Sequence, residues 1–184
     1  GGLGVVKYYC DDAEFVNRAL EALEQTAEKG DRIYKWKSSL GQDKGIGYNI
    51  CLSHGMSSIV SVLSLLESEG INRERRDRII RHTCNYILSQ EIDHVKYGAF
   101  FPSQSLENNP GDDNHYSRLA WCYGDLGVAT SLWQAGKALH NREWQEKALE
   151  VLRFSTSRRD FRNAGVIDAG LCHGAASVCM MFHY

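Results

Sequence analysis

The stretch Trp121-Cys122-Tyr123-Gly124-Asp125-Leu126-Gly127-Val128 decides the fold, because it opens a segment with no charged residue from Leu126 to Gly136. A helix that is apolar on every side is buried inside its protein. The same pattern, a glycine, two residues and a small residue before an apolar run, occurs at Gly1-Gly2-Leu3-Gly4-Val5, Gly55-Met56-Ser57-Ser58-Ile59 and Gly174-Ala175-Ala176-Ser177-Val178. The chain is therefore predicted to repeat a unit built around a buried helix.

Helices of a second kind alternate with the buried ones. Two charged segments carry an apolar stripe with the spacing of a half-exposed helix. The stripes are Ile80, Cys84, Ile87 and Leu88 after Asn72, and Trp144, Ala148, Val151 and Leu152 after Asn141. The glycines that open the buried helices are 54, 69 and 50 residues apart, in the range of helical repeat units. These patterns predict an all-α fold in which inner helices face a centre and outer helices cover them.

Composition limits the class of protein and of partner. A chain of 184 residues with 43% hydrophobic and 24% charged residues suits one globular domain. The net charge is −2 and there is no basic stripe, which argues against a nucleic-acid partner. We find no apolar run long enough for a transmembrane segment and no signal peptide. The six cysteines are therefore expected to be reduced thiols of a cytoplasmic protein.

The two ends of the chain suggest a piece of a longer protein. The chain begins at Gly1-Gly2 without an initiator methionine. It stops at Met181-Phe182-His183-Tyr184, inside an apolar run that has no helix cap. We therefore expect a domain that is incomplete at both ends.

The segment from Glu91 to Arg118 is predicted to be a long loop. It holds both prolines of the chain and the turn cluster Asn-Asn-Pro-Gly-Asp-Asp. Because it leads directly to Arg118 and Cys122, it is a candidate rim over a site or a contact for a substrate peptide. A plain connection between helices is an equally good interpretation.

Cysteine and histidine residues far apart in the sequence form a candidate zinc site. Cys122 is followed fifty residues later by Cys172-His173, so the chain offers two thiolates and one imidazole. Three protein ligands leave one position of a tetrahedral zinc open, as in a reactive site. The close ligand pairs of zinc fingers are absent, so the fold would have to assemble this site. The other cysteines, which we interpret as core residues, are Cys10, Cys51, Cys84 and Cys179.

Three of these strings carry a resemblance to a known family. Ser53-His54-Gly55, Trp121-Cys122-Tyr123-Gly124 and Cys172-His173-Gly174 look like the signature of lanthionine synthetase C-like proteins, the cyclases of lantibiotic biosynthesis. The resemblance spans essentially the whole chain in the right order. It implies an α/α toroid of helical hairpins with zinc at its centre. Residues 1–184 would form a single, partial toroid domain of this type.

The resemblance also assigns site residues. It implies that Zn²⁺ is bound by Cys122, Cys172 and His173, that His54 is catalytic, and that Tyr123 and Arg118 belong to the catalytic site. The family's catalytic aspartate would fall before Gly1, so it is cut off or absent. Two departures from the family pattern are Ser58 and Ser177, which stand where a second glycine is usual.

The chemistry of such a site favours the addition of a thiol to an alkene. Coordination to zinc deprotonates a thiol at neutral pH, whereas a free cysteine is mostly protonated. A thiolate adds to the electron-poor alkene of dehydroalanine or dehydrobutyrine, and the resulting enolate needs a proton. His54 is a candidate general acid or base for that proton, and Arg118 or Tyr123 a candidate for stabilising charge or holding the amide.

Three functions remain open at this point. The first is a zinc-dependent cyclase that acts on a dehydrated precursor peptide beside a dehydratase. The second is a conjugase that adds glutathione or another small thiol to dehydrated residues. The third is a zinc-stabilised scaffold that binds peptide without turnover. A scaffold needs the zinc ligands but no proton-transfer group, so His54 separates it from the two enzymes.

Overall fold

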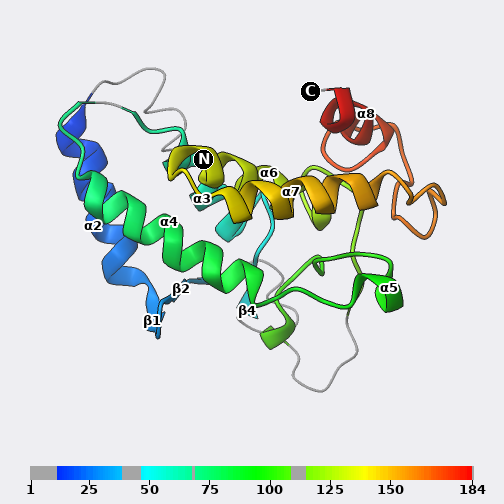
Figure 1. Ribbon diagram of the computed structural model, residues 1–184, viewed down its shortest axis with the longest axis horizontal. Coiled ribbons are helices and arrows are strands. Elements are labelled where there is room, and N and C mark those ends of the chain that lie inside the picture. The colour runs from blue at the N-terminus through cyan, green and yellow to red at the C-terminus, as the bar shows by residue number, and fades with distance from the viewer. Residues whose placement is uncertain (1–11, 39–46, 68, 109–114, 184) are drawn as a thin grey trace.

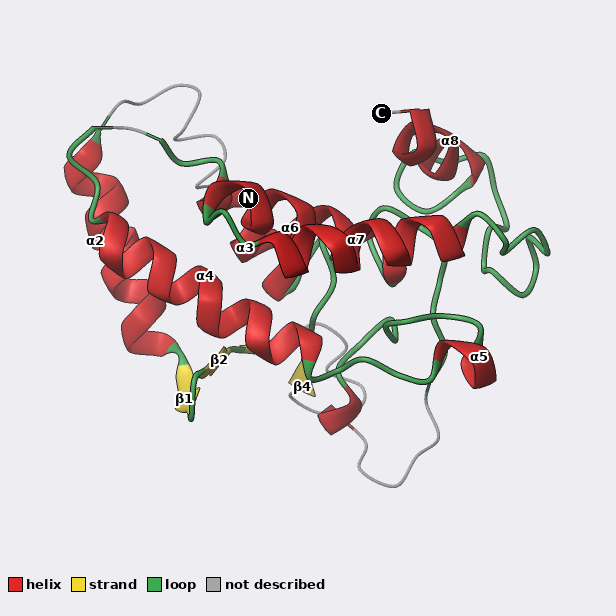
Figure 2. Ribbon diagram, viewed as in Figure 1, coloured by secondary structure: helices red, strands yellow, loops and turns green. Residues whose placement is uncertain are grey.

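The computed structural model describes residues 12–38, 47–67, 69–108 and 115–183, and helices dominate these segments (Figures 1 and 2). The glycine motif at Gly1 and the thiol of Cys10 lie outside the described residues. The α-helices are α2 (Ala13–Thr26), α3 (Met56–Ser64), α4 (Arg73–Leu88), α5 (His94–Tyr97), α6 (Asp125–Ala138), α7 (Arg142–Ser155) and α8 (Ala175–His183). The prediction of an all-α fold is confirmed.

Two pairs of inner and outer helices are arranged as the sequence predicts, whereas α8, which the Gly174 motif predicts to be buried, has Ser177 as its buried residue and is otherwise largely exposed. Helices α3 and α6 pack against each other, α4 packs on α3, and α7 packs along α6 (Figure 1). The side chains of Leu63 in α3 and Leu132 in α6 are fully buried in the shared core. Each pair of inner and outer helices is thus a hairpin, and the two hairpins stack side by side, as expected for part of an α/α toroid.

The outer helices begin at side-chain caps. The Asn72 carboxamide oxygen accepts a hydrogen bond from the backbone N–H of Arg75 at 3.0 Å, and the Asn141 oxygen accepts one from Trp144 at 3.1 Å. Such caps satisfy N–H groups that the first helical turn leaves without partners. The apolar stripe of each outer helix then faces the core, as Ile80 in α4 shows by its full burial.

Two small antiparallel ladders between α2 and α3 were not predicted. Strand β1 (Glu28–Gly30) pairs with β2 (Ile33–Lys35), and β3 (Lys37–Ser38) pairs with β4 (Gly47–Tyr48). With two or three residues each, these strands are too short to show an alternating pattern in the sequence. Packing of β2 against α4 stabilises them, because the ring of Tyr34 on β2 is buried in the core.

The long loop between α4 and α6 is confirmed, with only α5 and the 3-10 helix η2 (Leu106–Asn108) within its described part. It is firmly attached to the helical core. The side chains of Phe100 and Phe101 are buried, and their backbone N–H groups donate to the Asp125 carboxylate at 3.1 and 2.8 Å. The loop is therefore fixed at the first residue of α6.

Helix α8 lies at the edge of the structure beyond α7 (Figure 1). Ser177 faces the body of the protein and is fully buried, whereas Cys179 is exposed. Two residues correspond to about 200° around a helix, so these side chains point in nearly opposite directions. The core assignment of Cys179 is therefore wrong, while those of Cys51 and Cys84 are confirmed.

Among the described segments, no helix has both the length and the apolar character needed to span a membrane.

Candidate metal centre

Cys122 is held in place by the segment that precedes α3. Its backbone carbonyl accepts hydrogen bonds from the N–H groups of Leu52 at 3.1 Å and Ser53 at 3.3 Å. The Ser53 hydroxyl lies 3.4 Å from the same oxygen. The thiol-bearing residue is only 2% exposed. The loop before one inner helix thus fixes the loop before the next.

Hydrogen bonds also attach the segment that carries Cys172 and His173. The Ser177 hydroxyl on α8 accepts a hydrogen bond from the backbone N–H of Trp121 at 2.8 Å. The N–H of Leu119 donates to the carbonyl of Ala164 at 2.8 Å. These bonds bring two loops that are fifty residues apart in sequence to the same place.

The three predicted zinc ligands come together at this junction. One Sγ atom each from Cys122 and Cys172 and one ring nitrogen of His173 lie within 4.8 Å of one another. Around a tetrahedral zinc with bonds of about 2.3 Å to sulfur and 2.0–2.1 Å to nitrogen, such atoms are about 3.6–3.8 Å apart. A contraction of about 1 Å would therefore complete the ligand set, so these residues fit the metal.

The electrostatics of Cys122 keep its thiol neutral in the metal-free protein. Burial, reinforced by the neighbouring Cys172 thiol, raises the pKa of Cys122 to about 12, while the positive charge of Arg118 acts in the opposite direction. The protein alone therefore keeps this thiol protonated. A bound divalent cation reverses the balance, because coordination stabilises the thiolate.

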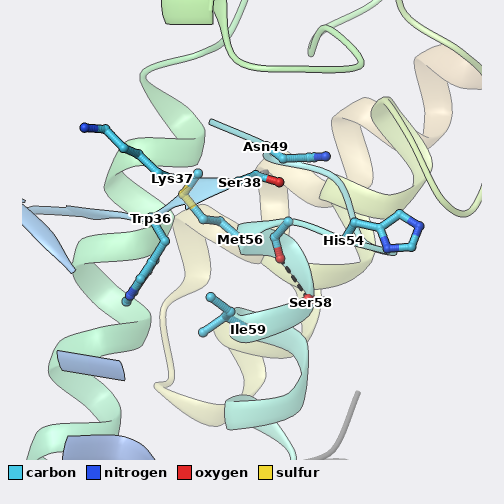
Figure 3. A pocket seen from close by; sticks show the side chains of 9 residues that line it. Trp36, Lys37, Ser38, Asn49, His54, Met56, Ser58 and Ile59 are labelled. Atoms are coloured by element: carbon cyan, nitrogen blue, oxygen red, sulfur yellow. Dashed lines mark hydrogen bonds between the residues drawn. The ribbon is translucent and has the colours of Figure 1, made fainter. Parts of the chain in front are cut away.

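His54 stands at the head of α3, next to the segment that holds Cys122. Its backbone N–H donates to the Cys51 thiol at 3.2 Å, and its side chain is exposed. It lies at the rim of an open pocket of about 310 Å³. Figure 3 shows the imidazole pointing away from the apolar side chains of Trp36 and Ile59 that line this pocket. The ring is thus free of the apolar packing that a core histidine would show.

Tyr123 directly follows Cys122 in the sequence, and its phenol lies in the electrostatic environment of Cys51 and Asn49. Burial is the main reason that the pKa of Tyr123 is raised. The Asn49 side chain accepts the N–H of Cys51 at 2.9 Å. Cys51 therefore accepts the backbone N–H of His54 and lies in the electrostatic environment of Tyr123, a position that its interpretation as a core residue did not predict.

Arg118 has a clear structural contact. Its Nε donates to the backbone carbonyl of Gly165 at 2.9 Å, and its own N–H donates to the Ser103 hydroxyl at 3.0 Å. The side chain thus bridges two loops through a carbonyl. Because its charge also acts on Cys122, it lies in the electrostatic environment of the thiol cluster.

The glycines of the repeated motif allow the backbone segments to approach one another. A Cβ atom on Gly55 would overlap the carbonyl of Asn49, and one on Gly124 would overlap the carbonyl of Arg118. Gly124 also has a φ of 77°, which side chains rarely tolerate. The glycines are therefore required by backbone contacts beside the site.

Two serines at the departures from the family pattern make hydrogen bonds of their own. The Ser58 hydroxyl donates to the carbonyl of Gly55 at 2.8 Å, and the Ser177 hydroxyl accepts the backbone N–H of Trp121 as described above.

Sequence reasoning also missed a buried ion pair between Asp125 and Arg158. The signal in the sequence that could have identified Asp125 is its position as the acidic residue that directly precedes the uncharged run of α6.

Comparisons with known proteins identify the relatives of this chain. A family model described as lanthionine synthetase C-like protein matches residues 2–184. The nisin biosynthesis protein NisC of Lactococcus lactis subsp. lactis is 22% identical over 141 residues, which are 73% of this chain and 33% of that protein. A solved structure of a nisin cyclase matches 98% of this chain and 48% of its own length, with a TM-score of 0.71 and 18% identity. The chain thus spans about half or less of the relatives that it matches.

Proposed function

Because the chain belongs to the lanthionine synthetase C-like family, we propose that it carries the zinc centre of a cyclase. In this reaction a peptide cysteine adds to dehydroalanine or dehydrobutyrine and forms a lanthionine or methyllanthionine ring. The observation that carries the proposal is the meeting of Cys122, Cys172 and His173 from distant segments. We assign residues 1–184 to a single domain of this cyclase, and the activity to the whole protein of which the domain is a part.

The two thiols and the imidazole would hold the zinc ion. When bound there, zinc supplies the positive charge that turns an incoming peptide thiol into a thiolate. The ligand set of two thiolates and one neutral imidazole is electron-rich, which keeps such a sulfur nucleophilic. The buried position of Cys122 excludes water from that side of the site.

The reaction is an addition in which nothing is released. A bond forms between the sulfur and the β-carbon of the dehydrated residue, and the alkene electron pair moves toward the adjacent carbonyl oxygen. The α-carbon then takes up a proton. We assign the delivery of this proton to His54, because its exposed imidazole is adjacent in sequence to Ser53, which contacts Cys122.

Arg118 and Tyr123 support the reaction from within the protein. The guanidinium group of Arg118 places positive charge near the thiol cluster, where negative charge develops. The phenol of Tyr123 lies in the electrostatic environment of Cys51, whose thiol accepts the backbone N–H of His54. We propose that both residues mainly orient the site, with Arg118 adding charge stabilisation.

The proposed partner is a dehydrated precursor peptide, delivered by a dehydratase. A cyclase of this type needs reduced thiols at Cys122 and Cys172, and the five described cysteines are all free. The cytosol maintains thiols in this state. We therefore propose the cytoplasm as the place of action.

Two measurements test the proposal. Elemental analysis should find about one zinc per chain in the wild type and a loss in the Cys172→Ala, His173→Ala double variant. A peptide with one cysteine and one dehydrobutyrine should lose its free thiol when incubated with the full-length protein. Ring closure leaves the mass unchanged, so alkylation of the remaining thiol followed by mass spectrometry reports it.

The same assay separates the alternatives. A conjugase would add the mass of glutathione to the peptide instead of closing a ring. A scaffold would bind the peptide without consuming its thiol, and His54→Gln would leave that binding unchanged. For the cyclase, His54→Gln should retain zinc and lose most of the turnover, by about 10²–10⁴-fold for a general acid. Full turnover in this variant would exclude the role of His54.

A further inference from the structure

Asp168 lies four residues before Cys172 and has no role in the sequence-based assignments. Its carboxylate faces the imidazole of His173, with 3.4 Å between Oδ2 of Asp168 and Nε2 of His173. Its other oxygen accepts the N–H of Gly170 at 2.7 Å, and its backbone carbonyl accepts the N–H of Ala175 at 2.8 Å. Both the side chain and the backbone of Asp168 are therefore anchored.

The local fold presses Asp168 against the zinc-ligand segment. The N–H of Gly174 donates to the carbonyl of Gly170 at 2.9 Å, which closes the loop that contains Cys172 and His173. A Cβ atom at Gly174 would overlap the carboxylate of Asp168. The glycine after His173 thus makes room for the aspartate that contacts the histidine.

From this geometry we propose that Asp168 is a positioning residue for His173 at the zinc site. It accepts a hydrogen bond from Nε2–H and so leaves Nδ1 without a proton and available to the metal. A neutral imidazole carries one N–H, so fixing that N–H on one nitrogen assigns the other as the ligand. This inference rests on the proposed function, because it requires zinc at the cluster.

Asp168 itself lies outside the ligand set. Among the described residues, the cluster of mutually close ligand atoms consists of Cys122, Cys172 and His173. A carboxylate that contacts a metal-bound histidine from outside orients the ring and increases its basicity, and its loss typically weakens metal binding by 10–100-fold. The Asp168 and His173 side chains are 45% and 41% exposed, so solvent competes with their contact. We therefore expect an effect near the lower end, about tenfold.

Competition with a zinc chelator tests the proposal in this chain. Asp168→Asn keeps an oxygen to accept the N–H of Gly170 but turns a donor toward Nε2 of His173. Its zinc dissociation constant should rise about tenfold. Glu146→Gln removes one negative charge from the exposed face of α7 and controls for net charge, so its dissociation constant should match that of the wild type. Circular dichroism of each metal-free variant checks that the helices are intact.

Nitrogen NMR of the zinc-loaded wild type provides a second readout. Long-range couplings between ring protons and nitrogens should identify Nε2 of His173 as protonated and Nδ1 as the metal ligand. Zinc bound through Nε2, or equal zinc affinity in Asp168→Asn and wild type, would overturn the inference while leaving a zinc cyclase intact. A wild type without zinc would overturn both this inference and the proposed function.

Discussion

Replacing Asp125 by asparagine should remove a pH dependence from the stability of the protein. The Asp125 carboxyl is fully buried, and burial raises its pKa from 3.8 to about 6 despite its contacts with two backbone N–H groups and Arg158. Between these two pH values the folded protein holds a proton that the unfolded chain has released. Stability must therefore fall as the pH rises through this range.

The size of the effect follows from the two pKa values. At about 1.36 kcal/mol per pH unit, wild-type stability relative to Asp125→Asn should fall by about 3 kcal/mol in total between pH 3 and pH 7, with about 2 kcal/mol of this fall between pH 4 and pH 6. Urea unfolding of both metal-free proteins, followed by circular dichroism over pH 3.5–7.5, gives this difference. The titrations of histidines and exposed carboxylates cancel when the two proteins are compared.

A matched substitution controls for the lost charge. Asp31→Asn removes one negative charge from the exposed turn between β1 and β2, and should not reproduce the fall. If the difference between wild type and Asp125→Asn stays constant or grows with pH between 4 and 6, the reasoning is refuted. That result would mean that Arg158 and the two N–H groups outweigh burial.

Three further predictions concern the loops and the outer layer. Gly124→Ala should destabilise the metal-free protein by more than about 2 kcal/mol in urea unfolding, because Gly124 has a φ of 77° and an added Cβ would overlap the carbonyl of Arg118. Gly98 has a φ of 71° but faces open space, so Gly98→Ala should lower the free energy of unfolding by less. Equal losses in the two variants would contradict this reasoning. Ser177→Ala should cost about 1–2 kcal/mol in the same assay, because the N–H of Trp121 loses its acceptor; an unchanged midpoint would show that water replaces the hydroxyl. Two arginines lower the pKa of Glu24 to about 2, so Glu24→Gln should reduce the free energy of unfolding at pH 7 by about 1–2 kcal/mol, a value discounted because these arginines are partly exposed. This loss should vanish as the pH falls from 4.5 toward 2, because Glu24 is then protonated in the wild type. A loss that persists at pH 2 would mean that packing, not charge, stabilises the wild type.

The sequence predicted the inner and outer helices of the two hairpins because their signals are local, whereas it did not predict α2. An uncharged apolar run identifies α6 as buried, and the stripe that begins at Trp144 identifies α7 as half-exposed, without reference to any other segment. The short strands escaped prediction because two or three residues cannot establish a period, and their pairing depends on α4 behind them.

The sequence predicted which residues could bind the metal, and the fold brought these residues together. The side chains of Cys122, Cys172 and His173 suggested a metal by their chemistry alone, because thiolate and imidazole are the ligands that zinc prefers. The role of Ser177 could not be predicted, because its hydrogen-bond partner, the backbone N–H of Trp121, belongs to a segment more than fifty residues away.

The sequence by itself thus determined that α3 and α6 are buried, that α4 and α7 cover them, and which side chains suit zinc, because periodicity and ligand chemistry belong to each segment alone. Only the tertiary structure decided that the loop of Cys122 meets the loop of Cys172, through the hydrogen bond from Trp121 to Ser177. It alone also placed the carboxylate of Asp168 against His173. Contacts of this kind depend on how helices pack against one another, and no pattern within a single segment encodes that packing.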